Sequence, residues 1–134
     1  MNTRSDRGAV LLEFALVIAL LVALATGIAD AGIAFRIKHV LKIAAREGAR
    51  LASVTPGLTD KDARVLTVVN EILKESDVKG AATTVETNGP TTGLPVTVKI
   101  TYGYVPLFPL IGLGLGGPLV LESSTTMRYE VVGS

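Results

Sequence analysis

Residues 9–29 read Ala9-Val-Leu-Leu-Glu-Phe-Ala-Leu-Val-Ile-Ala-Leu-Leu-Val-Ala-Leu-Ala-Thr-Gly-Ile-Ala29, with a single charged side chain, Glu13. About 20 apolar residues at ~1.5 Å each cover the ~30 Å hydrocarbon core of a bilayer. A single segment satisfies all its backbone hydrogen bonds there only as a helix. The stretch therefore predicts a transmembrane helix over about residues 9–30. Asp30 then marks the exit end of the span or makes a buried polar contact between helices.

Two other interpretations of this apolar stretch are a core helix of a soluble protein and a cleaved secretory signal. A core helix of a soluble protein is disfavoured, because the roughly 100 remaining residues could hardly surround a helix that is apolar on every side. A cleaved secretory signal has a small-x-small cleavage site, which Ala23-Leu-Ala25 offers. The stretch is nevertheless long, and its helical pattern continues past Ala25, so a membrane anchor is the better interpretation.

The helical pattern runs well beyond the predicted span. Small and apolar residues recur at spacings of three and four up to Ala52, and no proline precedes Pro56. This periodicity is typical of an amphipathic helix. We therefore expect one helix over residues 9–54, ended by Thr55-Pro-Gly57. At ~1.5 Å per residue it is far longer than a bilayer is thick, so its second half needs another packing partner.

The remainder of the chain predicts a small mixed domain. A second helix is expected from Thr59, as the amino-terminal cap, to about Ser76. Three later segments are expected to be strands: residues 83–87, 96–102 and 119–132. Asn88-Gly-Pro90 predicts a turn, and the uncharged segment Val105–Pro118 predicts a flap on the sheet or a contact surface for a neighbour or for lipid headgroups. The fold class is α+β: a long amino-terminal transmembrane and amphipathic helix, then one short helix and an antiparallel sheet.

Small residues form a flank on the second half of the long helix. Ala44, Gly48 and Ala52 are spaced by four, as are Ala45 and Ala49. Such a flank allows another backbone to approach closely. The partner is either a helix of another protein or this chain's own sheet, and the sequence favours neither.

The composition argues against several classes of function. The net charge of +1 offers no basic excess for a nucleic acid, and the chain has no cysteine and one histidine. These counts leave little for a metal centre or a catalytic triad. We therefore expect no enzyme activity, no cofactor, no metal site and no small-molecule substrate.

Two motifs resemble a known family. Arg7-Gly8 followed by Ala9-Val-Leu-Leu-Glu13-Phe14 resembles the processing site of prepilins, in the Glu-Phe form of tight-adherence pili. Ala44-Ala-Arg-Glu-Gly-Ala-Arg50 resembles the TadE-like minor pilins, or pseudopilins, and this motif also makes Arg46, Glu47 and Arg50 candidate contact residues. The resemblance covers residues 7–54 and about 96–130.

The resemblance implies a processed membrane protein that is a substrate of prepilin peptidase. Residues 1–8 are the leader, the cut falls between Gly8 and Ala9, and the new Ala9 amine pairs with Glu13, next to Phe14. The alternative for Glu13 is a residue that only marks the end of the span. Other pilins or minor pilins, the inner-membrane assembly platform and membrane lipid are the implied partners.

The resemblance also implies a topology. It puts the domain of residues 55–134 in the periplasm of a bacterium, held by a single pass of the inner membrane. The Lys and Arg count, which is higher after the span than before it, points the other way. The implied function is a minor pilin or pseudopilin in assembly of a tight-adherence pilus. The alternative is a single-pass anchored scaffold of another envelope complex.

Overall fold

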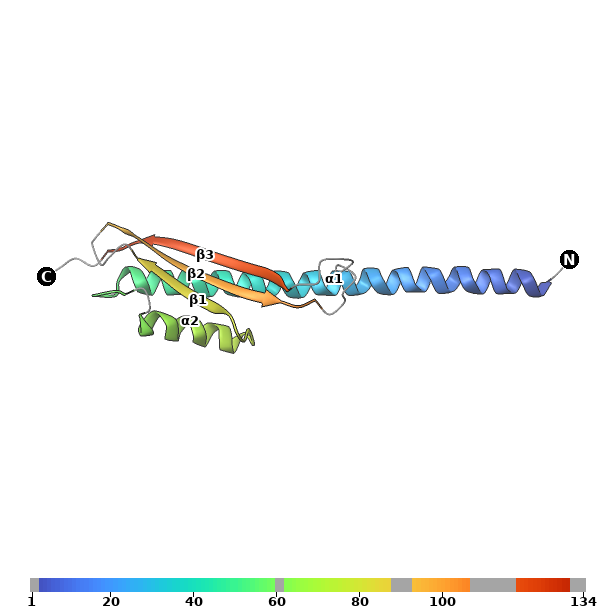
Figure 1. Cartoon of the computed structure of the whole chain (residues 1–134), viewed down its shortest axis with the longest axis horizontal. Helices are drawn as coiled ribbons and strands as arrows, with labels where there is room; N and C mark the ends of the chain where they lie inside the picture. Colours follow the sequence, from blue (N-terminus) through green and yellow to red (C-terminus); the bar gives the residue numbers. More distant parts are fainter. Residues whose placement is uncertain (1–2, 60–61, 88–92, 107–117, 131–134) are drawn as a thin grey trace. The chain divides into compact units, whose positions relative to one another are not determined.

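The computed structural model describes residues 3–59, 62–87, 93–106 and 118–130, with side chains from residue 8 onward (Figure 1). The chain divides into two compact units. The first unit comprises Met1–Ile33 with Pro106–Gly117, and the second comprises Ala34–Val105 with Pro118–Ser134. The predicted turn at residues 88–90 and most of the segment 105–118 lie outside the described residues.

Helix α1 (Thr3–Ser53) is unbroken and contributes to both units. The predicted long helix is confirmed, and it begins upstream of residue 9. Its end is closed by hydroxyl groups: Thr55 Oγ1 donates to the carbonyl of Leu51 at 2.7 Å, and Ser53 Oγ donates to that of Arg50 at 2.8 Å. These bonds satisfy carbonyl groups that the last turn leaves without a helical partner.

Helix α2 (Ala63–Glu75) begins later than the sequence suggests. Its amino-terminal cap is Asp62 and not Thr59, because the Asp62 carboxylate accepts from the backbone N–H of Arg64 at 3.0 Å. The helix ends in a Schellman motif, with Val78 N–H donating to Leu73 at 2.8 Å and Asp77 at φ 58°.

Three antiparallel strands form one sheet in the order β1 (Ala82–Thr87), β2 (Pro95–Tyr104), β3 (Leu119–Arg128). All three strands occur where the sequence predicts them, but β3 ends at Arg128 and does not run to residue 132. Beyond Arg128, Tyr129 still exchanges backbone hydrogen bonds with Gly93 and Leu94, and the N–H of Glu130 then donates to the carbonyl of Ser53 at 2.8 Å. Residues 131–134 lie outside the described part.

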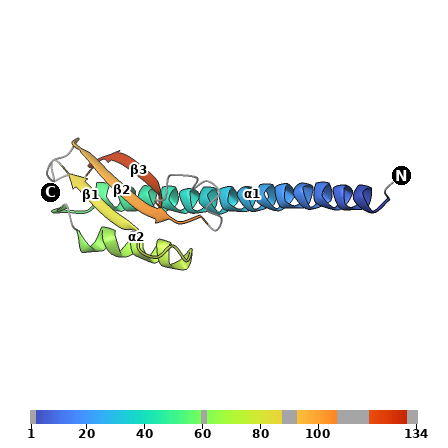
Figure 2. The ribbon, with the colours of Figure 1, turned by 45° about the vertical axis from the view of Figure 1, so that its right-hand side comes forward.

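The core of the second unit lies between the sheet and the two helices. Alternation along β2 turns Val96, Val98 and Ile100 to the inner face, where each is fully buried. α2 contributes Val65 and Val69 from successive turns. Figures 1 and 2 show α2 and the sheet beside the same part of α1, residues 34–53. The second half of α1 is therefore the central element of this unit.

Candidate functional site

The predicted processing site lies in regular helix. Gly8 and Ala9 are both within α1 and both exposed. A Cβ atom built on Gly8 meets nothing within 4 Å. A larger side chain at residue 8 is therefore compatible with the fold, and a requirement for glycine there has to come from outside this chain.

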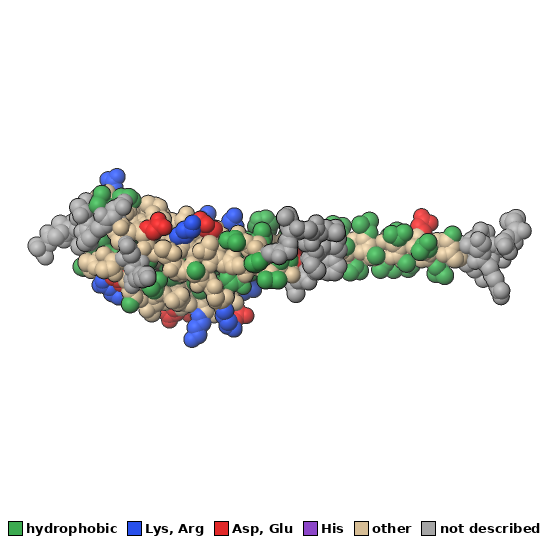
Figure 3. Space-filling view, viewed as in Figure 1, with side chains coloured by type: hydrophobic (Ala, Val, Ile, Leu, Met, Phe, Trp, Pro, Cys, Tyr) green, Lys and Arg blue, Asp and Glu red, His purple; other side chains and the backbone are tan. Residues whose placement is uncertain are grey.

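Glu13 and Phe14 follow on the same exposed helix, and Phe14 is 62% exposed. Large hydrophobic side chains are exposed on every side of this part of α1, from Val10 to Ile28, and Figure 3 shows apolar side chains along the face in view. α1 is long and apolar enough to cross a membrane, over a segment placed within Gly8–Ser53. The first unit is compatible with single-pass membrane anchoring.

Asp30 differs from its neighbours. It is 3% exposed, and between Gly8 and Arg36 it is the one residue that is buried. A carboxylate at such a depth requires compensation by polar partners or by its protonation. That the span ends at Asp30 remains a prediction.

The small-residue flank packs inside the second unit. Ala44, Ala45, Ala49 and Ala52 are fully buried. A Cβ atom on Gly48 would lie 2.6 Å from Val69 Cγ2 and 3.3 Å from Val98 Cγ1. Of the two alternatives for this flank, the structure has the internal one: the flank receives α2 and β2 of the same chain, and its motif residues Ala44, Ala45 and Gly48 are not available to a partner helix.

The charged residues of the same motif point outward. Arg46 and Arg50 are exposed and Glu47 is half-buried. Glu47 accepts from Arg50 Nε at 2.9 Å, one helical turn away. An exposed pair of this kind contributes little to stability. The motif thus combines a buried small-residue face with a charged outer face.

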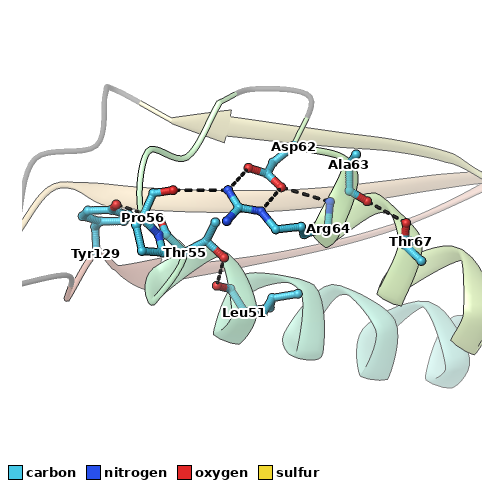
Figure 4. A network of polar contacts seen from close by, with 8 residues as sticks. All are labelled: Leu51, Thr55, Pro56, Asp62, Ala63, Arg64, Thr67 and Tyr129. Carbon is cyan, nitrogen blue, oxygen red and sulfur yellow. Dashed lines mark hydrogen bonds and ion pairs between the residues drawn. The ribbon is translucent and has the colours of Figure 1, made fainter.

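A polar network closes the second unit at the end of α1 (Figure 4). The buried hydroxyl of Tyr129 donates to the carbonyl of Thr55 at 2.7 Å. The Arg64 guanidinium bonds both oxygens of Asp62, at 3.0 and 2.6 Å, and also the carbonyl of Pro56 at 3.2 Å. These contacts join the end of α1, the start of α2 and the residue that follows β3.

Hydrogen bonding sets the charge state of this network. The side-chain hydrogen bond from Arg64 lowers the pKa of the Asp62 carboxyl, and burial opposes the shift.

At the far end of α2, Arg36 of α1 donates to the carbonyl of Ser76 at 3.2 Å. A cation is favourable there, because the carboxyl end of a helix carries partial negative charge.

Sequence reasoning missed the residues of this network. Tyr129, Thr55 and Arg64 lack a pattern that singles them out. For the small-residue flank, in contrast, the sequence held one signal: the valines at positions 65 and 69, whose bulk complements small residues. Among the described residues, no group of three His, Cys, Asp or Glu side chains could hold a metal ion.

The comparison with known proteins concerns helix α1. The model of the family described as TadE-like protein matches residues 8–50. Over these residues the chain is similar to TadE-like proteins. The match covers the exposed first half of α1 and the motif that ends at Arg50. It does not extend to α2 or the sheet. Comparisons with curated proteins and with solved structures gave no match.

Proposed function

We propose that this TadE-like chain is a minor pilin or pseudopilin that takes part in assembly of a tight-adherence pilus. The observation that carries the proposal is the position of the family match. It begins at Gly8, the residue that precedes the proposed cut. The exposed apolar helix that follows is the form expected of a pilin anchor. In this proposal the chain is a substrate of prepilin peptidase and not itself an enzyme.

The proposed location is the bacterial inner membrane, with the second unit in the periplasm. Other pilins or minor pilins and the inner-membrane assembly platform are the proposed partners. This topology follows the family resemblance and not the Lys and Arg count, which predicts the opposite orientation. That count is spread along α1 and not gathered in a short loop, where it would bear most strongly on orientation.

Glu13 has a specific role in this proposal. After a cut at Gly8, Ala9 carries a free ammonium group four residues before the Glu13 carboxylate. One helical turn separates them, so they compensate each other within one subunit or between neighbours. An uncompensated carboxylate within the span would cost several kcal/mol at the bilayer centre, about 2.5–3.5 on insertion scales.

The processing step is tested with Gly8→Val in cells that have an active prepilin peptidase. Because nothing lies within 4 Å of a Cβ at this position, the substitution leaves the fold intact and any effect arises in the peptidase. We expect full-length protein to accumulate in the membrane. The matched control is Gly32→Val in the same helix, also without a neighbour within 4 Å, which should be cut normally.

Mass spectrometry of the mature amino terminus gives the outcome. A start at Ala9 in the wild type and in Gly32→Val, and at Met1 in Gly8→Val, supports the proposal. An intact Met1 start in the wild type would instead favour the anchored scaffold of another envelope complex.

Assembly is tested separately with Glu13→Ala. Removal of the charge favours insertion, so the variant should reach the membrane and be cut. We expect pilus number to fall while the membrane level holds, and Glu13→Asp to retain part of the function. Unchanged pilus number in Glu13→Ala would leave Glu13 as a boundary residue only.

A further inference from the structure

The exposed apolar side chains of the second unit gather at one end. Val105, Leu119 and Val120 are 73%, 52% and 65% exposed. The β2–β3 register pairs Tyr104 with Leu119 and Gly103 with Val120, so these residues lie at the same end of the sheet, with Leu119 and Val120 on its opposite faces. We call Val105, Leu119 and Val120 the hairpin end.

The hairpin end lies beside the start of the α1 segment that belongs to the second unit, residues 34–53. The opposite end of β3 is tied to the end of α1, because Tyr129 bonds Thr55 and Glu130 bonds Ser53. Ten residues of strand back to Leu119 span about 33 Å. Residues 34–53 of α1 span about 29 Å. Within the second unit, Figures 1 and 2 agree that β3 starts beside this part of the helix.

Phe35 adds a further exposed side chain at this end. It is 74% exposed, one residue after the unit begins. Of the large hydrophobic side chains exposed among the described residues of this unit, only Ile43 and Val54 lie elsewhere. A scatter of single exposed hydrophobics is normal, whereas their concentration at one end is typical of an interaction surface.

The chain itself brings this end to the membrane. Ala34 follows Asp30 by four residues, which reach at most about 14 Å fully extended and about 6 Å as helix. The headgroup layer on each side of the hydrocarbon core is about 5–7 Å thick. If α1 crosses the bilayer up to about residue 30, the end of the unit that starts at Ala34 therefore stays at or near the headgroups.

The chemistry of this end fits a lipid surface. Residues 105–118, which join β2 to β3, include no charged side chain in the sequence. Lys38 is exposed on the first turns of the same helix segment, as is Arg36, which also donates to the carbonyl of Ser76. Aliphatic side chains beside cations are the composition of interfacial membrane-binding segments.

We propose that the hairpin end inserts into the boundary between headgroups and acyl chains of the membrane that α1 crosses, giving the domain a second attachment to the bilayer. The proposal rests on the proposed membrane anchoring by α1. It makes the domain a lipid-docked unit, held at its helix and at its sheet. Release of the sheet contact is then needed before the domain can leave the membrane surface.

The experiment uses the full chain, which has no cysteine, with a single environment-sensitive fluorophore attached at one introduced cysteine. Val120→Cys reports on the hairpin end. Ser124→Cys is the matched control, because it is exposed on the same face of β3, about 13 Å further along the strand. Ile18→Cys reports on the span. The protein is placed in vesicles of phosphatidylcholine and phosphatidylglycerol that contain a lipid with a nitroxide near the top of its acyl chain or, in a parallel sample for residue 18, near the end of that chain.

We expect blue-shifted emission and nitroxide quenching at residue 120 several-fold above that at residue 124, with strong quenching at residue 18. Equal, weak quenching at residues 120 and 124 with strong quenching at residue 18 would overturn the proposal and leave the anchoring intact. A blue shift at residue 120 without quenching would assign the hairpin end to a protein contact and also overturn it. Absent quenching at residue 18 would overturn both the anchoring and the proposal that rests on it.

Discussion

The two halves of α1 share one backbone conformation and are both rich in alanine, but their surfaces are opposite. In the first half, leucines such as Leu16 and Leu20 are 66% and 70% exposed. In the second half, Leu41 and the alanines of the small-residue flank are fully buried. The difference lies in how apolar residues are distributed around the helix. Apolar residues on all sides suit lipid, and small residues on one flank suit a packed core.

The largest effect is expected from a bulky side chain at Gly48, where α1 lies closest to Val69 of α2. Gly48→Leu should lower the free energy of unfolding of the second unit by about 3 kcal/mol, the upper end of the usual cost of overpacking. The β-branched Val69 side chain, 2.6 Å from the new Cβ, has little freedom to move aside. Urea unfolding of the full chain in vesicles, followed by hydrogen exchange of β2, measures the change.

The matched control is Gly32→Leu in the first half of α1. No atom lies within 4 Å of its Cβ, and leucine has the higher helix propensity by most of a kcal/mol. Stability of the second unit should be unchanged. An equal loss in both variants would remove the distinction between the two halves.

The second test concerns the buried closure of the second unit. Tyr129→Phe removes the hydroxyl that bonds Thr55 and leaves that carbonyl buried without this donor. We expect a loss of about 1–2 kcal/mol in the free energy of unfolding, measured by the same urea experiment. Tyr102→Phe is the control, since Tyr102 is half-buried and its hydroxyl has no hydrogen-bond partner among the described residues. Equal, negligible effects of Tyr129→Phe and Tyr102→Phe would show that the bond from Tyr129 to Thr55 contributes nothing to the free energy of unfolding.

The third test concerns the cap of α2. Asp62→Ala should cost about 1 kcal/mol at neutral pH, the usual value of an amino-terminal cap. Because the folded pKa of Asp62 is lowered, its contribution is present above its unfolded pKa and is lost as pH falls through the folded value. Asp62→Asn keeps a cap acceptor and should flatten the decline of stability below about pH 4. An unchanged acid limb in Asp62→Asn would exclude this carboxylate as its cause.

The smallest effect is expected on the outer face of the second half of α1. Arg46→Ala and Glu47→Ala should each change stability by less than about 0.5 kcal/mol, since Arg46 is exposed and the pair of Glu47 with Arg50 is on the surface. Loss of pilus assembly in these variants at unchanged thermal stability would show that this face serves a partner. A large fall in melting temperature would instead show that the charges belong to the core.

Sequence reasoning predicted the elements with strong periodicity and failed where tertiary contacts decide. The helix over residues 9–54 and the strand at residues 96–102 follow from local patterns of apolar residues. The cap of α2 does not follow from local sequence, because Thr59 and Asp62 are both suitable cap residues. The hydrogen bonds from the Arg64 guanidinium to Asp62 and to the carbonyl of Pro56 favour Asp62. The end of β3 depends on bonds to Ser53 and Thr55, which are distant in sequence.

The same limit applies to the candidate site. A flank of small residues is equally suited to a helix of another protein and to an internal sheet, and only the contacts of Val69 and Val98 at Gly48 decide between the two. The prediction for Gly8 and Glu13 depends instead on a chemical step in another protein. Their exposed positions are compatible with that step, and its test lies in processing and assembly.

In the proposed function, α1 is a lipid-facing anchor in its first half, and in the structure its second half is a core element. Hydrogen exchange of the full chain in vesicles, measured across a urea series, tests this division most directly, because each cooperative unit loses protection as a whole. We predict that amides of residues 37–52 lose protection together with those of α2 and β2, while residues 10–29 stay protected. Loss of protection along all of α1 in one step, or retention in residues 37–52 after β2 has opened, would contradict the account.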